Sequence, residues 1–396
     1  MLDTKSHHPT GSALAHSWSR LNGVDGLRGL AIFFVLMNHV NMRLVIAHIP
    51  YGQSLPEQLL SPLVWNGQYG VQIFFAVSGF LITSTSLRRW GTPFGIRPRD
   101  FYLLRIARVA PLLILLLIIL VLLHFTQSEW FYVTAKVGGV GRALLAALTF
   151  RINVLEAQAG YLPGSWDVLW SLSIEETFYL VFPLVCLWLG RGRWLLVLLA
   201  VFVVMGPFAR TIWAHHNEVW QEYSYLGGMD AIALGCLTAL LVPRLRFTNV
   251  GWLFVQALGA ALMIFILGFS LTVERWGLAD TGLNMTIVAL GACMVMAAVA
   301  QTRQKGSAAI RPLIWLGQRS YEIYLTHMFV VIGFFVLFTK LGKPLSAVPI
   351  LFVAVVLVSA VLGELVGRFY SEPMNRFLRK RWGDTPSKLG AVIEAT

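Results

Sequence analysis

The chain has 396 residues, of which 57% are hydrophobic and 13% are charged, and its formal net charge is +12 at pH 7. This composition excludes a pair of ordinary soluble domains and is typical of a chain whose solvent is the lipid bilayer. The basic residues form short clusters between apolar runs, so we interpret the charge as membrane topology and expect no nucleic-acid partner. Cys186, Cys236 and Cys293 lie in apolar segments without metal-ligand spacing, so no metal site is expected.

Apolar runs long enough to cross a hydrocarbon core of about 30 Å recur along most of the chain. We predict an all-α polytopic membrane protein with about ten transmembrane helices and both termini in the cytoplasm. A cytoplasmic tail (1–22) should precede the transmembrane domain (23–375), and a second cytoplasmic tail (376–396) should follow it. The predicted spans are 28–47, 67–87, 106–125, 167–189, 194–213, 225–242, 250–271, 282–300, 313–338 and 348–369.

With ten spans and cytoplasmic termini, every dense basic cluster falls on the cytoplasmic side of the membrane. One short apolar segment, 143–155, disturbs this arrangement. It carries Arg151 and Asn153, and if it crossed the membrane every later basic cluster would lie outside. We therefore predict a re-entrant or half-spanning helix. Lipid tolerates such a segment only where protein or a water-filled cavity covers its polar backbone.

The first span carries Arg28 at its cytoplasmic end and His39 near its middle. At 1.5 Å per residue, His39 lies about 16 Å deeper than Arg28 and within about 20° of the same helix face. Ionisable side chains at this depth cost roughly 2.5 to 3.5 kcal/mol on insertion scales, so each needs a partner or a purpose. For His39 alone, catalysis and a hydrogen bond between helices explain the residue equally well.

Glu175 reaches the bilayer centre from the opposite direction, about 12 to 14 Å from the outer end of its span. A carboxylate beside an imidazole favours the imidazolium that forms when a histidine takes a proton from a hydroxyl. Glu176 points about 100° away, where a salt bridge to another helix would explain it. Ser171 and Tyr179 lie one turn before and after Glu175, so they could orient its carboxylate or line an acceptor path.

Later spans hold further polar candidates. Ser320, Tyr324 and His327 form one stripe on a helix, and for His327 we favour interhelical hydrogen bonding over a second catalytic histidine. Asp230 lies only a few residues inside the outer end of its span, where we expect water to reach it. A functional role and a structural role are equally open for Asp230.

The loop after the second span is rich in arginine. Arg105 and Arg108 are three residues apart on one helix face. Positive-inside bias and attraction to anionic lipid explain such a cluster, but arginine is also suited to bidentate phosphate recognition. A polyphosphate acyl donor such as coenzyme A therefore fits this position.

Five sequence motifs, spread over roughly residues 23–375, are specific when taken together. They are Arg28-x10-His39, Phe74-Phe-Ala-Val-Ser78-Gly79-Phe80-Leu-Ile, Arg105-Ile-Ala-Arg108-Val-Ala-Pro111, Trp170-Ser-Leu-Ser-Ile-Glu175-Glu176-Thr-Phe178-Tyr179 and Ser320-Tyr321-Glu-Ile-Tyr324-Leu-Thr-His327. In this combination the chain resembles the acyltransferase 3 family of integral membrane acyltransferases.

The resemblance implies transfer of an acyl group, commonly acetyl, from cytoplasmic acyl-CoA to a hydroxyl of a carbohydrate, a glycolipid or a glycosylated small molecule. Acyl-CoA would be a co-substrate rather than a tightly bound cofactor, and the membrane would be the bacterial inner membrane. The implied catalytic residues are His39, Glu175 and Arg28, and the implied donor-binding residues are Arg28, Arg105 and Arg108. The implied supporting or substrate-binding residues are Ser171, Glu176, Tyr179, Asp230, Tyr324 and His327.

The chain departs from the family pattern in two places. The family usually has an Arg two residues before the position of Asp230, where this chain has Gly228, so we expect any Arg–Asp pair there to be lost. The chain also ends soon after its last span, without room for the SGNH-type domain that some members carry. We therefore expect it to finish the transfer itself or to pass the acyl group to a separate extracytoplasmic protein.

Two other classes of function compete with acyl transfer. A proton-coupled transporter would use a His39 and Glu175 pair as a proton relay. A non-catalytic scaffold ranks last, because Arg28 and His39 share one helix face and the arginine cluster is predicted on the same, cytoplasmic side of the membrane. Within acyl transfer, His39 acts either as general base or as a nucleophile that carries the acyl group, and the sequence leaves both open, together with the acceptor and the acyl length.

Overall fold

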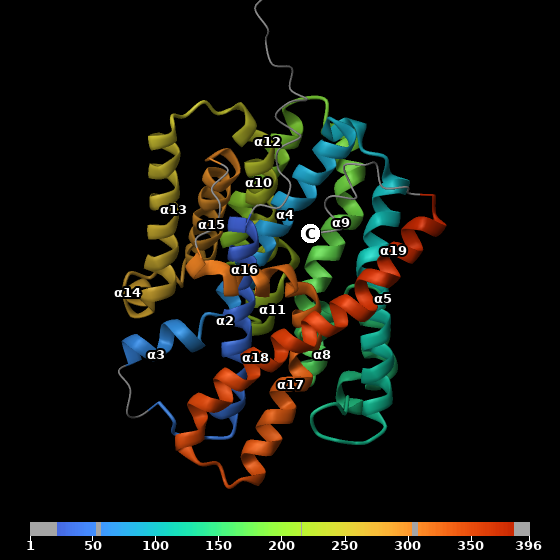
Figure 1. The fold of residues 1–396 in the computed structure, drawn as a ribbon, viewed down its shortest axis with the longest axis vertical. Coiled ribbons are helices and arrows are strands. Elements are labelled where there is room, and N and C mark those ends of the chain that lie inside the picture. The colour runs from blue at the N-terminus through green and yellow to red at the C-terminus, as the bar shows by residue number, and fades with distance from the viewer. Residues whose placement is uncertain (1–21, 53–56, 215, 303–307, 384–396) are drawn as a thin grey trace, which may run out of the picture.

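The computed structural model describes residues 22–52, 57–214, 216–302 and 308–383, and all regular secondary structure in these ranges is helical (Figure 1). The predicted all-α fold is therefore confirmed. The long helices are α2 (Asn22–Ile46), α4 (Gly67–Trp90), α5 (Pro98–His124), α9 (Leu169–Leu189), α10 (Trp194–Arg210), α12 (Tyr225–Leu241), α13 (Asn249–Gly268), α15 (Leu283–Thr302), α17 (Ser320–Lys340) and α18 (Val348–Val366).

Shorter helices connect or extend these long ones. They are α3 (Glu57–Val64), α6 (Gly139–Leu148), α7 (Ile152–Ala159), α8 (Gly164–Asp167), α11 (Glu218–Tyr223), α14 (Ser270–Arg275), α16 (Arg311–Gln318) and α19 (Glu372–Arg381). Single 3-10 turns occupy Pro93–Gly95, Ala135–Val137, Val242–Arg244, Ala308–Ile310 and Leu345–Ala347, and a π-helical turn occupies Gly367–Ser371.

Nine helical segments within the described ranges are long and apolar enough to cross a membrane. They correspond to all of the predicted spans except 194–213. That span is α10, which is apolar but has only 17 residues and contains Pro207. At 1.5 Å per residue α10 reaches about 26 Å, slightly less than the hydrocarbon core. The side of the membrane on which the termini lie stays a prediction.

Two predicted segments are divided in the structure. The segment 143–155 is not one helix, because the chain turns at Phe150, whose φ is +55°, and separates α6 from α7. Protein groups cover the polar atoms of this break: Tyr225 Oη donates to the Phe150 carbonyl at 2.6 Å, and Asn153 Nδ2 donates to the Tyr223 carbonyl at 3.0 Å. The predicted span 313–338 is also divided, at Arg319, and its long helix begins at Ser320.

Glycines allow the central helices to approach one another closely. A Cβ atom at Gly317 on α16 would lie 1.8 Å from the Asp25 carbonyl oxygen of α2, and one at Gly79 on α4 would lie 2.0 Å from the Ile232 carbonyl oxygen of α12. Small residues at such contacts are how membrane helices bring their backbones together. The α2–α16 and α4–α12 contacts therefore fix the positions of α2 and α4, which carry several of the polar candidates, relative to their neighbours.

The helices form a bundle in which α13 and α15 pack together at one edge and α5 and α19 pack together at the other (Figure 1). Helices α2, α4, α9 and α17 occupy the region between these edges. Most of the predicted site residues lie on these four helices and on α5. The functional candidates thus face the inside of the bundle.

Candidate functional site

A cavity of about 540 Å³ is lined by residues of α2, α4, α5, α9, α16, α17 and α19. Its lining contains the arginines Arg28, Arg88, Arg89, Arg105, Arg108 and Arg379. The acidic residues of the lining are Asp25, Glu175 and Glu176. Along α4 the lining extends from Val71 to Trp90, which is about 28 Å of helix. The bundle therefore contains a deep cavity with an excess of positive charge.

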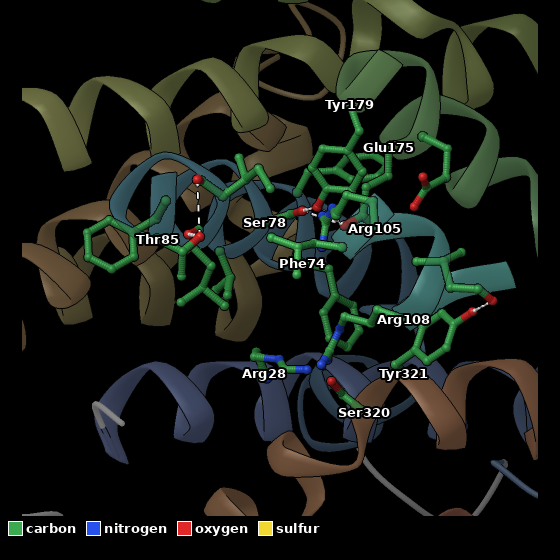
Figure 2. A pocket seen from close by; sticks show the side chains of 18 of the residues that line it. Arg28, Phe74, Ser78, Thr85, Arg105, Arg108, Glu175, Tyr179, Ser320 and Tyr321 are labelled. Carbon is green, nitrogen blue, oxygen red and sulfur yellow. Dashed lines mark hydrogen bonds between the residues drawn. The ribbon is translucent and has the colours of Figure 1, made fainter. Parts of the chain in front are cut away.

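Arg28 and Arg108 lie close together on one side of the cavity, beside Ser320 (Figure 2). Arg28 is also 3.4 Å from the carboxylate of Asp25, one turn earlier on α2. Arg105 lies on the other side, with its guanidinium 3.5 Å from the centre of the Tyr179 ring. The cavity lining thus includes every residue that the sequence assigned to donor binding, but Arg105 is separated from the other two.

Ser78, Glu175 and Tyr179 form a hydrogen-bonded triangle next to Arg105 (Figure 2). The hydroxyls of Ser78 and Tyr179 both donate to Glu175 Oε1, and they are in contact with each other. Glu175 and Tyr179 are one turn apart on α9, as predicted, whereas Ser78 comes from α4. Ser78 belongs to one of the sequence motifs, but its role could not be predicted from the sequence, because no local pattern connects α4 with α9.

His39 on α2 and His327 on α17 form a second polar group outside the cavity lining. Their ring centroids are 4.9 Å apart, and their planes make an angle of 69°. Nδ1 of His39 lies 2.8 Å from the Val35 carbonyl oxygen, and Nδ1 of His327 lies 2.7 Å from the Tyr324 carbonyl oxygen. A carbonyl only accepts hydrogen bonds, so both Nδ1 atoms donate and both Nε2 atoms keep a lone pair. Each histidine is therefore in the tautomer that a general base at Nε2 requires.

The expected contact between His39 and Glu175 is replaced by other contacts among the described residues. Glu175 accepts hydrogen bonds from Ser78 and Tyr179, while the backbone carbonyl of Val35 sets the tautomer of His39. The direct His39–Glu175 proton relay of the transporter hypothesis is thus not formed. Helix rotation decides this, because residues at the same depth meet only if their faces point toward each other.

Tyr324 connects the cavity with the histidine pair. Its side chain lines the cavity together with Ser171, and the two hydroxyls are 2.6 Å apart. Its hydroxyl also lies 2.8 Å from the Val168 carbonyl oxygen, to which it donates. On its other side, the Tyr324 ring centroid is 5.8 Å from that of His327. One aromatic side chain therefore lies between the arginine-lined cavity and the two histidines.

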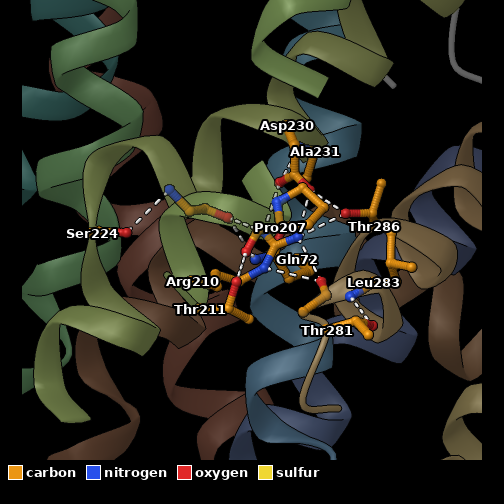
Figure 3. A network of polar contacts seen from close by, with 12 residues as sticks. Gln72, Pro207, Arg210, Thr211, Ser224, Asp230, Ala231, Thr281, Leu283 and Thr286 are labelled. Atoms are coloured by element: carbon orange, nitrogen blue, oxygen red, sulfur yellow. Dashed lines mark hydrogen bonds and ion pairs between the residues drawn. The ribbon is translucent and has the colours of Figure 1, made fainter. Parts of the chain in front are cut away.

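Asp230 belongs to a buried ion pair, which corrects two expectations. Its carboxylate binds Arg210 of α10 through two contacts of 3.0 and 2.8 Å, and Thr286 donates to it at 2.6 Å (Figure 3). Asp230 is 0% exposed, so water does not reach it. The expected loss of an Arg–Asp pair is also wrong, since Arg210 provides the guanidinium. A Cβ atom at Gly228 would lie only 2.7 Å from the Phe75 ring, which leaves no space for an arginine there.

The Arg210–Asp230 pair holds helices together. Arg210 Nη2 also donates to the Gly282 carbonyl at 2.9 Å, and Nη1 donates to the Gly227 carbonyl. These contacts join α10, α12 and the chain that leads into α15 (Figure 3). Within the described structure, neither Arg210 nor Asp230 belongs to the cavity lining. The structure therefore favours the structural role for Asp230 that the sequence left open.

A group of polar residues lies beyond the histidines, toward the end of α2 opposite the arginine-lined cavity. Arg43 follows His39 by one turn, and its guanidinium lies 5.6 Å from the Trp130 ring. Tyr223 Oη donates to Asp167 at 3.2 Å, and Asp167 interacts electrostatically with Arg43. These residues could not be predicted as a group from the sequence, because they come from segments that are far apart in the chain.

Within the part of the chain that the structure describes, no group of three or more His, Cys, Asp and Glu side chains is arranged to hold a metal ion. The acidic and imidazole groups are instead divided between the Glu175 triangle and the His39–His327 pair. What the site offers is a positively charged cavity, a hydrogen-bonded carboxylate and two imidazole nitrogens with free lone pairs.

The fold and this site define an integral membrane protein with an arginine-lined cavity next to a pair of histidines in contact. The model of a family described as an acyltransferase domain matches residues 21–364. The chain therefore belongs to this acyltransferase family, and the resemblance seen in its motifs is confirmed. No solved structure matches the chain.

Two relatives are similar along most of the chain. The peptidoglycan O-acetyltransferase OatA of Listeria monocytogenes is 25% identical in an alignment that covers 89% of this chain and 55% of that protein. The O-acetyltransferase OatA of Staphylococcus aureus is 24% identical in an alignment that covers 93% of this chain and 60% of that protein. The chain thus spans little more than half the length of these curated relatives.

Proposed function

We propose that the chain transfers an acyl group, with acetyl as the first to test, from cytoplasmic acyl-CoA to a hydroxyl of a carbohydrate in the cell envelope. The observation that carries this proposal is the arginine-lined cavity that leads to Tyr324 and, behind it, to the His39–His327 pair. Membership of an acyltransferase family supports the reaction class. The names of the relatives support an O-linked acetyl product and a carbohydrate acceptor.

The acyl donor binds in the cavity, with its phosphates toward the arginines. Arg28 and Arg108 lie together beside Ser320, so they are suited to hold one phosphate group between them (Figure 2). Arg105 has a different role, because it is stacked on Tyr179 beside the Glu175 carboxylate. We assign to Arg105 the task of neutralising Glu175 and Glu176, which keeps the Ser78–Glu175–Tyr179 triangle in place at the inner part of the cavity.

His39 is the general base in this proposal. Its Nε2 takes the proton as the acceptor hydroxyl oxygen attacks the thioester carbonyl carbon. The carbon–sulfur bond then breaks, and the proton passes from the His39 imidazolium to the departing CoA thiolate. The products are an O-acyl ester and CoA with a free thiol. Backbone fixation of the His39 tautomer at Val35 favours this role, since no further proton needs to move before the reaction.

His327 supports His39 in the same step. Its Nε2 is buried and has no hydrogen-bond partner among the described residues, although buried polar atoms are rarely left without one. The two rings are in edge-to-face contact, so an acceptor hydroxyl would satisfy this nitrogen from the edge of the pair. The acceptor would approach from the Arg43 end of α2, on the opposite side of the histidines from the cavity. The peptidoglycan sugars named for one relative are the first acceptors to test.

Release of CoA thiol tests the proposal. Wild type and His39→Gln, purified in detergent, are given acetyl-CoA with peptidoglycan fragments or simple amino sugars as acceptors. We expect acceptor-dependent thiol release and an acetylated sugar with wild type. We expect His39→Gln to keep its thermal unfolding profile and to lose at least about 100-fold of the rate. A His39→Gln protein as active as wild type would overturn the assignment of the base, and transport of solute without acyl transfer would overturn the function.

A further inference from the structure

Helix α19 lies beyond the part of the chain that matches the family, because the match ends at residue 364 and α19 begins at Glu372. Two side chains of α19, Asn375 and Arg379, nevertheless belong to the lining of the arginine-rich cavity. They are one helical turn apart, so they share a face. Asn375 is the last residue of the predicted transmembrane domain (23–375), whereas Arg379 lies in the predicted cytoplasmic tail (376–396). Part of that predicted tail therefore contributes to the wall of the cavity.

The position of α19 is held by contacts with two neighbouring parts of the bundle. Arg319, at the junction of α16 and α17, donates to Glu364 at 2.8 Å and also to Glu372, the first residue of α19. Tyr370 Oη donates to the Pro111 carbonyl of α5 at 3.1 Å. From this point α19 continues alongside α5, the helix that carries Arg105 and Arg108 (Figure 1). The helix is therefore docked on the bundle.

The π-helical turn Gly367–Ser371 separates α18 from α19. A π turn holds more residues than an α turn, so it changes the direction in which the following side chains point. Such turns are frequent at functional sites. Here the π turn comes directly before α19. It therefore helps to set the direction of the α19 face from which Asn375 and Arg379 reach the cavity lining.

Asn375 and Arg379 together offer the groups that recognise a nucleotide. Asn375 Oδ1 is buried without a hydrogen-bond partner among the described residues, so a ligand group that donates to it would satisfy it. The exocyclic amine of a base and the hydroxyl of a ribose are both such donors. Arg379 adds a guanidinium, which binds phosphate. Further cations come from Arg88 and Arg89 at the end of α4, about 15 Å along that helix from Ser78.

We propose that α19 is an acyl-donor-binding element, in which Arg379 binds a phosphate and Asn375 binds the ribose or base of the nucleotide part of a CoA thioester. This inference rests on the proposed function, because it takes the acyl donor to be a CoA thioester. Arg319 acts as a positioning residue, since it holds the start of α19 through Glu372. The nucleotide is bound near the ends of α4 and α19, and the pantetheine arm extends from there toward the Glu175 triangle.

Equilibrium binding tests this inference without requiring turnover. The dissociation constants of CoA and of pantetheine, which lacks the nucleotide, are measured by calorimetry on the detergent-purified protein. We expect Arg379→Ala to weaken CoA binding about tenfold or more, as for the loss of a charge-assisted hydrogen bond, and to leave pantetheine binding unchanged. Asn375→Asp places a negative charge in the cavity and should also weaken CoA binding selectively. Lys380→Ala is the matched control, because the adjacent Lys380 is exposed and outside the cavity lining.

The outcomes distinguish this inference from the proposed function. If wild type binds CoA and Arg379→Ala binds it as tightly as Lys380→Ala does, the role of α19 is overturned while the cavity keeps its proposed acyl donor. If Arg379→Ala weakens CoA and pantetheine equally, the residue does not recognise the nucleotide, and the inference is again overturned. If wild type binds no CoA, both proposals fall. Selective weakening of CoA binding in a protein that shows no acyl transfer would support α19 and overturn only the reaction.

Discussion

The imidazole rings of His39 and His327 meet edge to face, with their centroids 4.9 Å apart. They come from α2 and α17, and each ring is oriented by a backbone carbonyl of its own helix. Two lone-pair nitrogens are thereby held together inside the bundle, where an unpartnered polar atom is costly. This arrangement makes the pair, rather than a histidine–carboxylate couple, the centre of the proposed proton transfer.

The first prediction concerns His327. His327→Gln retains polar atoms but loses the imidazole nitrogen, so we expect kcat for acetyl transfer to fall roughly tenfold or more. The KM for acetyl-CoA should stay within about twofold, because His327 lies outside the cavity lining. Steady-state kinetics at saturating acceptor provide the measurement. A variant with unchanged kcat would show that His327 only joins helices.

The second prediction concerns the buried Arg210–Asp230 pair. Arg210→Met leaves the Asp230 carboxylate buried without its cation, which should reduce stability by about 3 kcal/mol or more. The double variant Arg210→Met with Asp230→Leu removes both charges and should be more stable than the single variant. Thermal unfolding in detergent compares the three proteins. If the double variant is the least stable, Arg210 and Asp230 do not act as a pair.

CoA binding provides the control for this second prediction. Any folded Arg210→Met protein should bind CoA as wild type does, because the pair lies away from the cavity lining. A large loss of CoA affinity in a folded variant would contradict the structural role assigned to Asp230.

The third prediction concerns the crossing of α2 and α16. The methyl group of Gly317→Ala would lie 1.8 Å from the Asp25 carbonyl oxygen, so the two helices must separate. We expect a loss of roughly 1 to 3 kcal/mol, as for other overpacked sites. Gly333→Ala on α17 is the control, because a Cβ atom there has no neighbour within 4 Å. Equal melting temperatures for the two variants would contradict this close packing.

The fourth prediction concerns Glu156 on α7. Burial, together with the nearby Asp167 charge, raises the pKa of Glu156 well above its usual value of 4.5. Because the pKa of Glu156 is higher in the folded state, folding favours the protonated side chain. The contribution of Glu156 to stability is therefore complete below pH 4.5 and is lost as pH rises through the folded-state pKa. We expect Glu156→Gln to flatten this decrease, because glutamine stays neutral and its Oε1 can still accept from the Leu162 amide. Unfolding temperatures measured from pH 4.5 upward check this, and parallel curves for the two proteins would refute it.

Much of the fold could be predicted from the sequence because a transmembrane helix satisfies its backbone hydrogen bonds within one segment. The span of α2 and the depth of His39 below Arg28 follow from apolar length and helical rise alone. The motifs also identified most of the residues that line the cavity, among them Arg105, Arg108 and Glu175. The division of the span 313–338 at Arg319 could not be predicted in this way, because it depends on how α16 packs against α2.

The sequence by itself determined the membrane class, the approximate spans and the acyltransferase family, since each depends on local apolar length or on motifs within one segment. Only the tertiary structure decided which polar groups meet. It joined Glu175 to Ser78 rather than to His39, joined Asp230 to Arg210 rather than leaving it unpaired, and brought Arg379 to the cavity. The physical reason is that contacts between helices depend on their relative rotation and crossing, which no single segment encodes.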